Sequence, residues 1–489
     1  MIDNIMLTLT LHFFVLLLSF VLFFADENGL CVVVFAIFSA IFELCLWASR
    51  EKRNLSLNWC HPVPVFVFGY CVVYYQLPFC YISGFDLSHY SNQVIFAPHN
   101  ISYCVLLAVI GLSSFFCGEQ ILYLRSNNDN FIKINVELGG NFESKNQRIM
   151  TVNNFVVFGS LLFFFFYIRS IGFYSYFGFS YGGATLPRGI LSTHFRFAFM
   201  VLLYLAILLE IYRLVLAKPD TLCGYFSVWD KRVLAVIIVT LVPFVLSGDR
   251  GAYLQPLALV VAPYYVLVKP LRFSQAVAAA IILSLMLVVV GDTRGRSVTL
   301  KEAFINRVEA VSNPAKWPTI ELANSFGTFN IATKYFPEYY SYNNGLNMLY
   351  RIASLVPFSS YFTEVEKKNK ENDYIFISSL FFTNILTRGT FSSGSGTSSL
   401  ADIYIDYGPY GIPIITFLWG VFMGFIGRKN SFTFSPVSVF LYAYYVYYSI
   451  YVNRSSFFFG WNIFVWVLIL FYFIDKLYID NLSVIDGRQ

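Results

Sequence analysis

The hydrophobic residues of this chain occur in long runs that polar residues seldom interrupt. A run of about 20 apolar residues can cross a hydrocarbon core of about 30 Å as a helix, because each helical residue adds about 1.5 Å. Transmembrane β-strands would instead show segments of about ten residues with alternating polarity. Runs such as residues 161–166 do not alternate. The pattern therefore predicts an all-α polytopic membrane protein.

About twelve transmembrane helices are expected from these runs. They cover Ile5–Phe24, Leu30–Trp47, Val63–Ile82, Ile101–Leu124, Val152–Ile171, Ile190–Tyr212, Val233–Leu246, Tyr253–Val268, Ser274–Val290, Tyr410–Ile426, Pro436–Val452 and Phe457–Ile474. The seventh and eighth runs are short, and one re-entrant hairpin is the alternative for them. Residues 1–290 thus hold transmembrane helices 1 to 9, residues 291–400 form a large loop, and residues 401–489 hold helices 10 to 12.

Composition and charge argue against the main soluble classes. Charged residues make up 12% of the chain, against about 25% in an average soluble domain. The net charge of +5 is too small to indicate nucleic-acid binding. The eight cysteines lie mostly in apolar runs and show no disulfide framework or CxxC metal pattern. The first run lacks a basic n-region and a cleavage site, so a retained helix is expected.

Basic residues predict the orientation, because basic loops tend to stay in the cytoplasm. Alternate connections contain Arg50, Lys52 and Arg53; Arg125, Lys133, Lys145 and Arg148; Arg213, Lys218, Lys231 and Arg232; Lys269 and Arg272; and Arg428 and Lys429. The connection after the first run instead contains Asp26 and Glu27. Both termini are therefore expected in the cytoplasm and the large loop on the opposite side.

Three acidic residues, Glu43, Glu119 and Glu210, fall near the expected cytoplasmic ends of their runs. We expect them to snorkel to the interface, or Glu210 to pair with Arg213 about one turn later.

The large loop contains three stretches with a helical amphipathic pattern, at residues 299–311, 320–335 and 346–355. Prolines at positions 314, 318, 337 and 357 punctuate them. This arrangement predicts a small helical cap on the outer membrane surface. Residues 389–399, GTFSSGSGTSS, favour a flexible linker, and an anion cradle is the alternative.

Arg250 is the most informative basic residue on the outer side. It lies in the segment SGDRG between two runs that are only about 21–24 Å long as helices. Arg250 should therefore lie below the interface, where a cation is costly unless it is paired with Asp249 or an anionic ligand. Guanidinium groups bind phosphate oxygens through paired hydrogen bonds, so we expect an anion site here.

Other basic residues are expected on the same side. They are Arg169, Arg188, His194, Arg196, Arg294, Arg296, Arg351, Arg388 and Arg454. For any one of them alone, a solvated interface anchor is the simpler interpretation. We select His194, Arg196, Arg294, Arg296 and Arg388 as further candidates for the anion site.

Three segments together resemble a known family. They are GTSSLADIYIDYGPYG at residues 396–411, before a run with Gly420 and Gly424; SGDRG at residues 247–251; and residues 321–357 with Gly327, Gly345 and Pro357. Their order and membrane placement are similar to those of oligosaccharide repeat-unit polymerases, the Wzy-type O-antigen and capsule polymerases of bacterial inner membranes. The resemblance covers roughly residues 240–425, and the number of helices extends it to the whole chain.

This resemblance implies a glycosyltransferase that needs no nucleotide sugar, cofactor or metal and has a GT-C-like fold. A growing glycan would leave its undecaprenyl pyrophosphate carrier and join the non-reducing end of a new carrier-linked repeat unit. The reaction would take place at the periplasmic face of the bacterial inner membrane. The family also implies membrane lipids and a separate chain-length regulator as partners.

The chemistry of this reaction suggests roles for the candidate residues. Arginines can stabilise a pyrophosphate leaving group without a metal, and we expect Arg250 to do so with Arg294, Arg296 or Arg388. A base on the opposite sugar face would activate the acceptor hydroxyl. The candidates are Asp249, Glu321, Asp402 and His194. For Asp402 the alternative is an acid that interacts with a helix dipole, with Asp406 solvating the same helix start.

Three other functions remain open. A lipid-linked oligosaccharide flippase also has about twelve spans, although its loops are generally short and its halves repeat. An O-antigen ligase uses the same donor with lipid A core as acceptor. A metal-dependent GT-C transferase would use Asp26 and Glu27, but this acidic pair has no second acidic motif to support it. Tyr339, Tyr340, Tyr342 and Trp317 either stack on sugars or belong to an interfacial aromatic belt.

Replacement of Arg250 tests the anion site. We expect Arg250→Ala to give a folded, inserted protein that makes no polymer, because the leaving group loses its paired hydrogen bonds. Lysine should restore activity only in part, since it keeps the charge but not the planar fork. Polymer length is measured on gels, and normal length in the alanine variant would contradict the assignment.

Overall fold

The computed structural model describes most of the chain. It covers residues 2–24, 29–54, 57–85, 87, 100–126, 142–177, 190–247, 250–292, 313–317, 319–356, 377–387, 396–427, 435–458 and 460–480. Within these residues every regular element is a helix and none is a strand. The all-α prediction is therefore confirmed for the described part of the chain.

The helices follow the hydrophobic runs closely. In chain order they are α1 (Ile2–Phe24), α2 (Gly29–Asn54), α3 (Pro62–Cys71), the π-helix η1 (Val72–Gln76), α4 (Leu77–Ile82), α6 (Ile101–Ser126), α7 (Phe142–Ile171), α8 (Phe173–Phe177), α9 (Ile190–Ala217), α10 (Leu222–Val228), α11 (Lys231–Ser247), α12 (Arg250–Leu267), α13 (Phe273–Asp292), η4 (Pro314–Lys316), α15 (Ile320–Ala323), α16 (Phe326–Tyr335), α17 (Leu346–Ala353), α19 (Ser378–Thr387), α20 (Ser399–Gly427), α21 (Pro436–Tyr451), η7 (Val452–Arg454), α22 (Trp461–Ile474) and the π-helix η8 (Asp475–Asp480).

Seven helical segments of the described chain are long and apolar enough to cross a membrane. They are Gly29–Lys52, Pro62–Ile82, Ile101–Ile121, Glu143–Ile171, Leu191–Ala217, Ser399–Gly427 and Trp461–Ile479, and Leu7–Ser19, Leu254–Leu267 and Phe273–Ile282 are shorter apolar helices. The chain is thus a polytopic membrane protein. Each of the twelve expected spans falls on a helix or a helical series, while twelve membrane crossings remain a prediction.

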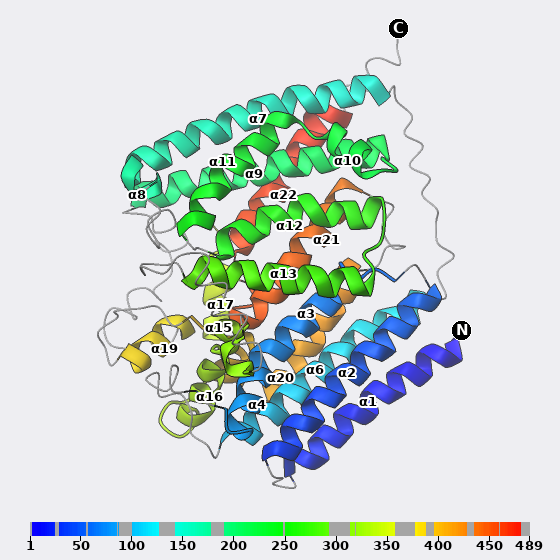
Figure 1. The fold of residues 1–489 in the computed structure, drawn as a ribbon, viewed down its shortest axis with the longest axis vertical. Helices are drawn as coiled ribbons and strands as arrows, with labels where there is room; N and C mark the ends of the chain where they lie inside the picture. Colours follow the sequence, from blue (N-terminus) through cyan, green and yellow to red (C-terminus); the bar gives the residue numbers. More distant parts are fainter. Residues whose placement is uncertain are drawn as a thin grey trace.

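The helices between the ninth and tenth expected spans gather at one end of the bundle. Figure 1 shows α15, α16, α17 and α19 together on one side, while α1 begins and α22 ends on the opposite side. The short α10, in one of the basic connections, lies on the same side as these two chain ends. This arrangement agrees with the alternation expected from the loop charges.

The cap differs in part from its prediction. Residues 320–335 form two helices, α15 and α16, and the side chains of Phe326 to Ala332 are buried on all faces of α16. The expectation of a surface helix with one exposed face is therefore wrong for α16, because it packs against both α20 and α6. The third stretch forms α17, and the first, residues 299–311, lies outside the described residues.

Glycines allow α20 and α6 to touch through their backbones. A Cβ atom at Gly420 would overlap the carbonyl oxygen of Phe115, and one at Gly118 would overlap that of Phe417. Small residues at such contacts let transmembrane helices approach closely and gain van der Waals contact. This pair is the most extensive helix contact among the described elements.

Gly408 divides α20 into two parts. Its backbone is not helical, with φ of 66° and ψ of −160°, and Pro409 follows it. The left-handed region suits glycine, which has no Cβ to clash. A Cβ at this position would lie 2.7 Å from the ring of Tyr342. The first part, from Ser399 to Tyr407, therefore belongs to the cap, and the predicted membrane run starts just after the break.

The three acids in the apolar runs are buried and paired. Glu43 contacts the ring nitrogen Nδ1 of His12 on α1, and both Glu119 oxygens accept hydrogen bonds of 2.6 Å from Arg50. Arg213 donates to both Glu210 oxygens, at 3.1 and 2.8 Å. The predicted Glu210 pair is confirmed. Snorkelling is wrong for all three, since their side chains are inaccessible to solvent.

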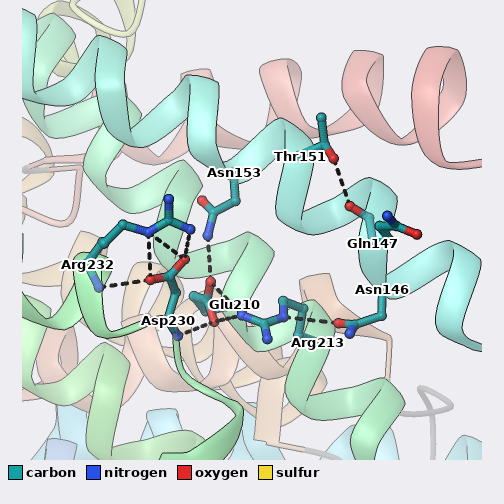
Figure 2. A network of polar contacts seen from close by, with 8 residues as sticks. All are labelled: Asn146, Gln147, Thr151, Asn153, Glu210, Arg213, Asp230 and Arg232. Atoms are coloured by element: carbon teal, nitrogen blue, oxygen red, sulfur yellow. Dashed lines mark hydrogen bonds and ion pairs between the residues drawn. The ribbon is translucent and has the colours of Figure 1, made fainter.

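Figure 2 shows how the Glu210 pair joins three segments of the chain. Asn153 of α7 and the backbone N–H of Asp230 donate to Glu210, at 2.5 and 3.1 Å. Arg213 in turn donates to Asn146 at 3.0 Å. Hydrogen bonds from the exposed Arg232 lower the pKa of the Asp230 carboxyl. The network therefore ties α7, α9 and the start of α11 together.

The α6–α20 contact should not tolerate even a small side chain in place of its glycines. We expect Gly420→Ala to lower the free energy of unfolding by about 1–3 kcal/mol, because the new methyl group meets backbone that cannot move aside. Gly159→Ala is the matched control, since its Cβ would meet only the flexible end of Leu202. The thermal unfolding midpoints of both variants are measured in detergent. Equal midpoints would contradict the proposed close contact.

Removal of Arg213 should leave an uncompensated charge. We expect Arg213→Ala to destabilise the protein by roughly 3–5 kcal/mol, because the buried Glu210 carboxylate loses its cation. The paired variant Glu210→Gln with Arg213→Met should recover much of this loss. Arg232→Ala, in the same network but exposed, should change little. The free energy of unfolding of all three variants is measured by denaturation with SDS. Similar losses of stability for Arg213→Ala and Arg232→Ala would refute the explanation.

Candidate functional site

The candidate residues fall into three groups. Asp249, Arg294, Arg296 and Arg388 lie outside the described residues. Arg250 is the first residue of α12. Because α11 begins on the side opposite the cap and only two residues separate its end from α12, α12 starts on the cap side of the bundle. His194, Arg196, Glu321 and Asp402 lie on described helices, so their surroundings can be compared with the prediction.

Asp402 lies in the first turn of α20 and is buried, with 1% of its surface exposed. The hydroxyl of Thr397 donates to Oδ1 at 2.6 Å. The second oxygen, Oδ2, is buried and accepts no hydrogen bond within the described structure. Its place at the helix start suits the dipole interpretation, but a dipole alone does not explain an unsatisfied buried oxygen, because such groups are rare and costly.

Three other segments bring polar groups to Asp402. Ser378 is the first residue of α19, Ser456 follows η7, and Arg351 lies in the last turn of α17. Their side chains are close enough to act on the Asp402 carboxylate. Ser378 Oγ is buried without a hydrogen-bond partner among the described residues. Residues 351, 378, 402 and 456 are far apart in sequence, so only the folded chain assembles this cluster.

Arg351 is the cation of this cluster. Its guanidinium acts on Asp402, yet no direct ion pair between the two appears in the described structure. Its Nε atom is buried and has no partner there. This differs from Glu210, whose two oxygens are both satisfied. A buried carboxylate with an unsatisfied oxygen, within electrostatic reach of a partly exposed guanidinium, makes this cluster the candidate ligand site among the described residues.

Asp406 has a different role from the one predicted. It lies one turn after Asp402, but its oxygens accept the backbone N–H groups of Asn347 and Met348 at 3.1 and 2.9 Å. These are among the first N–H groups of α17, which have no partner inside their own helix. Asp406 therefore caps α17 rather than the start of α20. This contact fixes the helix that carries Arg351 against the helix that carries Asp402.

Tyr74, in the π-helix η1, supports the same helix start. Its hydroxyl accepts the Leu400 N–H at 3.1 Å and lies 3.0 Å from Ser399 Oγ. π-Helical turns are rare and often occur at functional sites. Sequence reasoning did not identify Tyr74, since neither the apolar run nor its spacing distinguishes a π-helix from an α-helix.

The other described candidates lie elsewhere. Glu321 is on α15, which packs mainly against η1 rather than α20. Arg196 of α9 lies within electrostatic reach of Tyr167, Tyr176 and Tyr204, and the exposed His194 precedes it by two residues. Of the described candidates, Asp402 is thus the one near Arg351. We expected Arg351 on the outer side but did not select it for the anion site. The pyrophosphate roles of the remaining arginines stay predictions.

Aromatic residues of the cap pack against one another and against α20. Tyr335, Tyr340 and Phe381 pack together with ring centroids 5.5–6.4 Å apart. Tyr342 packs against Tyr404 of α20 at 5.9 Å. Most of these rings are engaged with one another, while Tyr339 is exposed, so both the sugar-stacking and the belt interpretations remain open.

Within the described residues, no three histidine, cysteine, aspartate or glutamate side chains gather as they would around a metal ion. Asp26 and Glu27 lie outside these residues. Comparison with known proteins adds no relative: no family model matches the chain, and no curated protein or solved structure matches it.

Proposed function

We propose that this membrane protein is a glycosyltransferase that polymerises lipid-linked oligosaccharide repeat units. The donor is a growing glycan on undecaprenyl pyrophosphate, transferred en bloc to the non-reducing end of a new carrier-linked unit. The product is an O-antigen or capsule polysaccharide, made on the outer side of a bacterial inner membrane. The observation that carries the proposal is the buried Asp402 carboxylate with the partly exposed Arg351 in its surroundings; within the described residues, Asp402 Oδ2 and Arg351 Nε have no hydrogen-bond partner.

The pair offers the two charges that this reaction requires. When the bond between the sugar C1 and the pyrophosphate oxygen breaks, that oxygen keeps the electron pair and gains negative charge. Arg351 can stabilise this charge through hydrogen bonds that are in place beforehand. Asp402 can accept the proton of the acceptor hydroxyl as that oxygen forms the new bond to C1. The proton then leaves Asp402 for water.

Other arginines extend the anion site in this proposal. Pyrophosphate carries more negative charge than one guanidinium can balance, so Arg250, Arg294, Arg296 and Arg388 remain proposed contacts for its second phosphate. Arg250 begins α12 on the side of the bundle where the cap lies. A GT-C-like fold, twelve spans with both termini in the cytoplasm, and a separate chain-length regulator belong to the same proposal.

Reconstitution tests the activity directly. The purified protein is placed in liposomes with an undecaprenyl-pyrophosphate-linked repeat unit, with no other acceptor and no added metal. A ladder of carrier-linked glycans that rises by one repeat unit supports the polymerase. Substrate that crosses the bilayer without a ladder supports a flippase. Transfer that occurs only when lipid A core is supplied supports the ligase, and either result overturns the proposal.

Substitutions at the pair should separate catalysis from folding. We expect Asp402→Asn and Arg351→Ala each to reduce the rate of chain extension at least about 100-fold, because each removes one charge from the transition state. Arg351→Lys should be less impaired. Arg169→Ala, an exposed arginine in the last turn of α7, is the control and should retain full activity.

Thermal unfolding is measured on the same preparations. A well-folded Asp402→Asn variant with normal ladders would show that the carboxylate has no catalytic role.

A further inference from the structure

His12 and Glu43 form a pair of titratable side chains inside the helix bundle. His12 lies in the apolar stretch Leu7–Ser19 of α1, and Glu43 lies in the candidate membrane span Gly29–Lys52. The ring nitrogen Nδ1 of His12 contacts Oε2 of Glu43, and neither side chain is accessible to solvent. Ionisable residues inside membrane spans are rare, because burying a charge there is costly, and they often mark sites for protons or ions.

The partner of Glu43 differs from the partners of the other two buried acids. Glu119 accepts two hydrogen bonds of 2.6 Å from Arg50, and Glu210 is likewise paired with an arginine. An arginine keeps its charge at every physiological pH, so each of these pairs has a fixed cation. A histidine can gain or lose a proton between about pH 5 and pH 8. The His12–Glu43 pair is therefore the one of the three whose cation can itself titrate.

Each member of the pair has a buried polar atom that makes no hydrogen bond within the described structure. These atoms are Nε2 of His12 and Oε1 of Glu43. The hydroxyl of Tyr75, in the π-helix η1, is also buried without a partner there. Buried polar groups are nearly always hydrogen-bonded. The pair therefore differs from a fully satisfied structural ion pair, since each of its members keeps an atom at which a proton can bind.

Packing against α6 fixes the imidazole ring. α1 packs mainly along α6 and touches α2 at few points. The ring of Phe116 on α6 stacks on His12, with centroids 5.4 Å apart and planes 4° from parallel. The contact of His12 with Glu43 is thus a specific polar link between α1 and α2. A change in the charge of either partner acts on the junction of these two helices with α6.

The other groups near the pair have settled charges. Ser113 and Cys117 of α6 come within interaction range of Glu43, as does Tyr75 of η1. Serine, cysteine and tyrosine side chains are ordinarily uncharged at neutral pH. Glu119, at a later position of α6, is neutralised by its arginine. A change of protonation near neutral pH therefore falls on the pair itself.

We propose that His12 and Glu43 form a proton-binding site within the membrane. With a neutral imidazole and a carboxylate, the pair carries one negative charge. One proton taken up from water gives either an imidazolium with a carboxylate or a neutral imidazole with a carboxylic acid, and both forms have no net charge. The bound proton removes a net charge that is costly to bury, and it returns to water when the pH rises. The site does not depend on the proposed polymerase activity.

Nuclear magnetic resonance tests proton binding directly. The full chain, with ¹⁵N-labelled histidine and ¹³C-carboxyl-labelled glutamate, is placed in nanodiscs, and spectra are recorded between about pH 5 and pH 8. The chain has five histidines, so His12→Gln assigns the ring signals of His12, and Glu43→Gln assigns the carboxyl signal of Glu43. We expect both sets of signals to change over the same pH interval, because interacting groups titrate as one pair.

Glu119 is the matched control in the same spectra. It is also buried, but it is paired with an arginine on α2, so its carboxyl signal should stay constant over this pH range. Glu119→Gln assigns that signal. Circular dichroism at both ends of the range checks that the chain stays helical.

The outcomes distinguish a proton-binding site from a structural pair. Signals of His12 and Glu43 that change together while Glu119 stays constant support the site. Signals of the pair that stay constant from about pH 5 to pH 8 overturn it, because the pair then has one fixed charge state. A change at His12 without a change at Glu43 overturns it too, since the two groups then do not share the proton. An equal change at Glu119 would mean that the response is not specific to the pair, and would also overturn the site.

Discussion

The backbone contact between α6 and α20 is the constraint on which the site depends. Gly118 and Gly420 let the two helices meet without side chains between them, and lipid offers little hydrophobic force to replace such packing. The part of α20 before the break at Gly408 carries Asp402 and Asp406. Asp406 in turn holds the start of α17, the helix that carries Arg351.

Charge compensation separates structural polar groups from the candidate site. Inside the bundle, Glu119 and Glu210 each have an arginine with direct hydrogen bonds, which offsets the cost of burying a carboxylate. Asp402 is also buried, but within the described residues it has no direct ion pair and its Oδ2 accepts no hydrogen bond. An unsatisfied buried carboxylate oxygen is destabilising, and for this reason we place Asp402 in the proposed site.

Many elements could be predicted because bilayer physics acts on local sequence. Apolar runs located the helices within a few residues, and the break at Gly408 falls just before the predicted run at Tyr410. The pairing of Glu210 with Arg213 was predictable since both lie on one helix. The partners of Glu43 and Glu119 were not, because His12 and Arg50 belong to other helices. The burial of α16 was missed for the same reason.

The sequence by itself thus determined the all-helical membrane class, the helix positions, the charge alternation of the loops and the presence of Asp402 at a helix start. Local periodicity and composition carry that information, since each depends on neighbours within a few residues. Only the tertiary structure decided that Arg351 comes within electrostatic reach of Asp402 and that Asp406 caps α17. Those residues are 51 to 59 positions apart in the sequence, and their arrangement follows from helix packing, which no local pattern encodes.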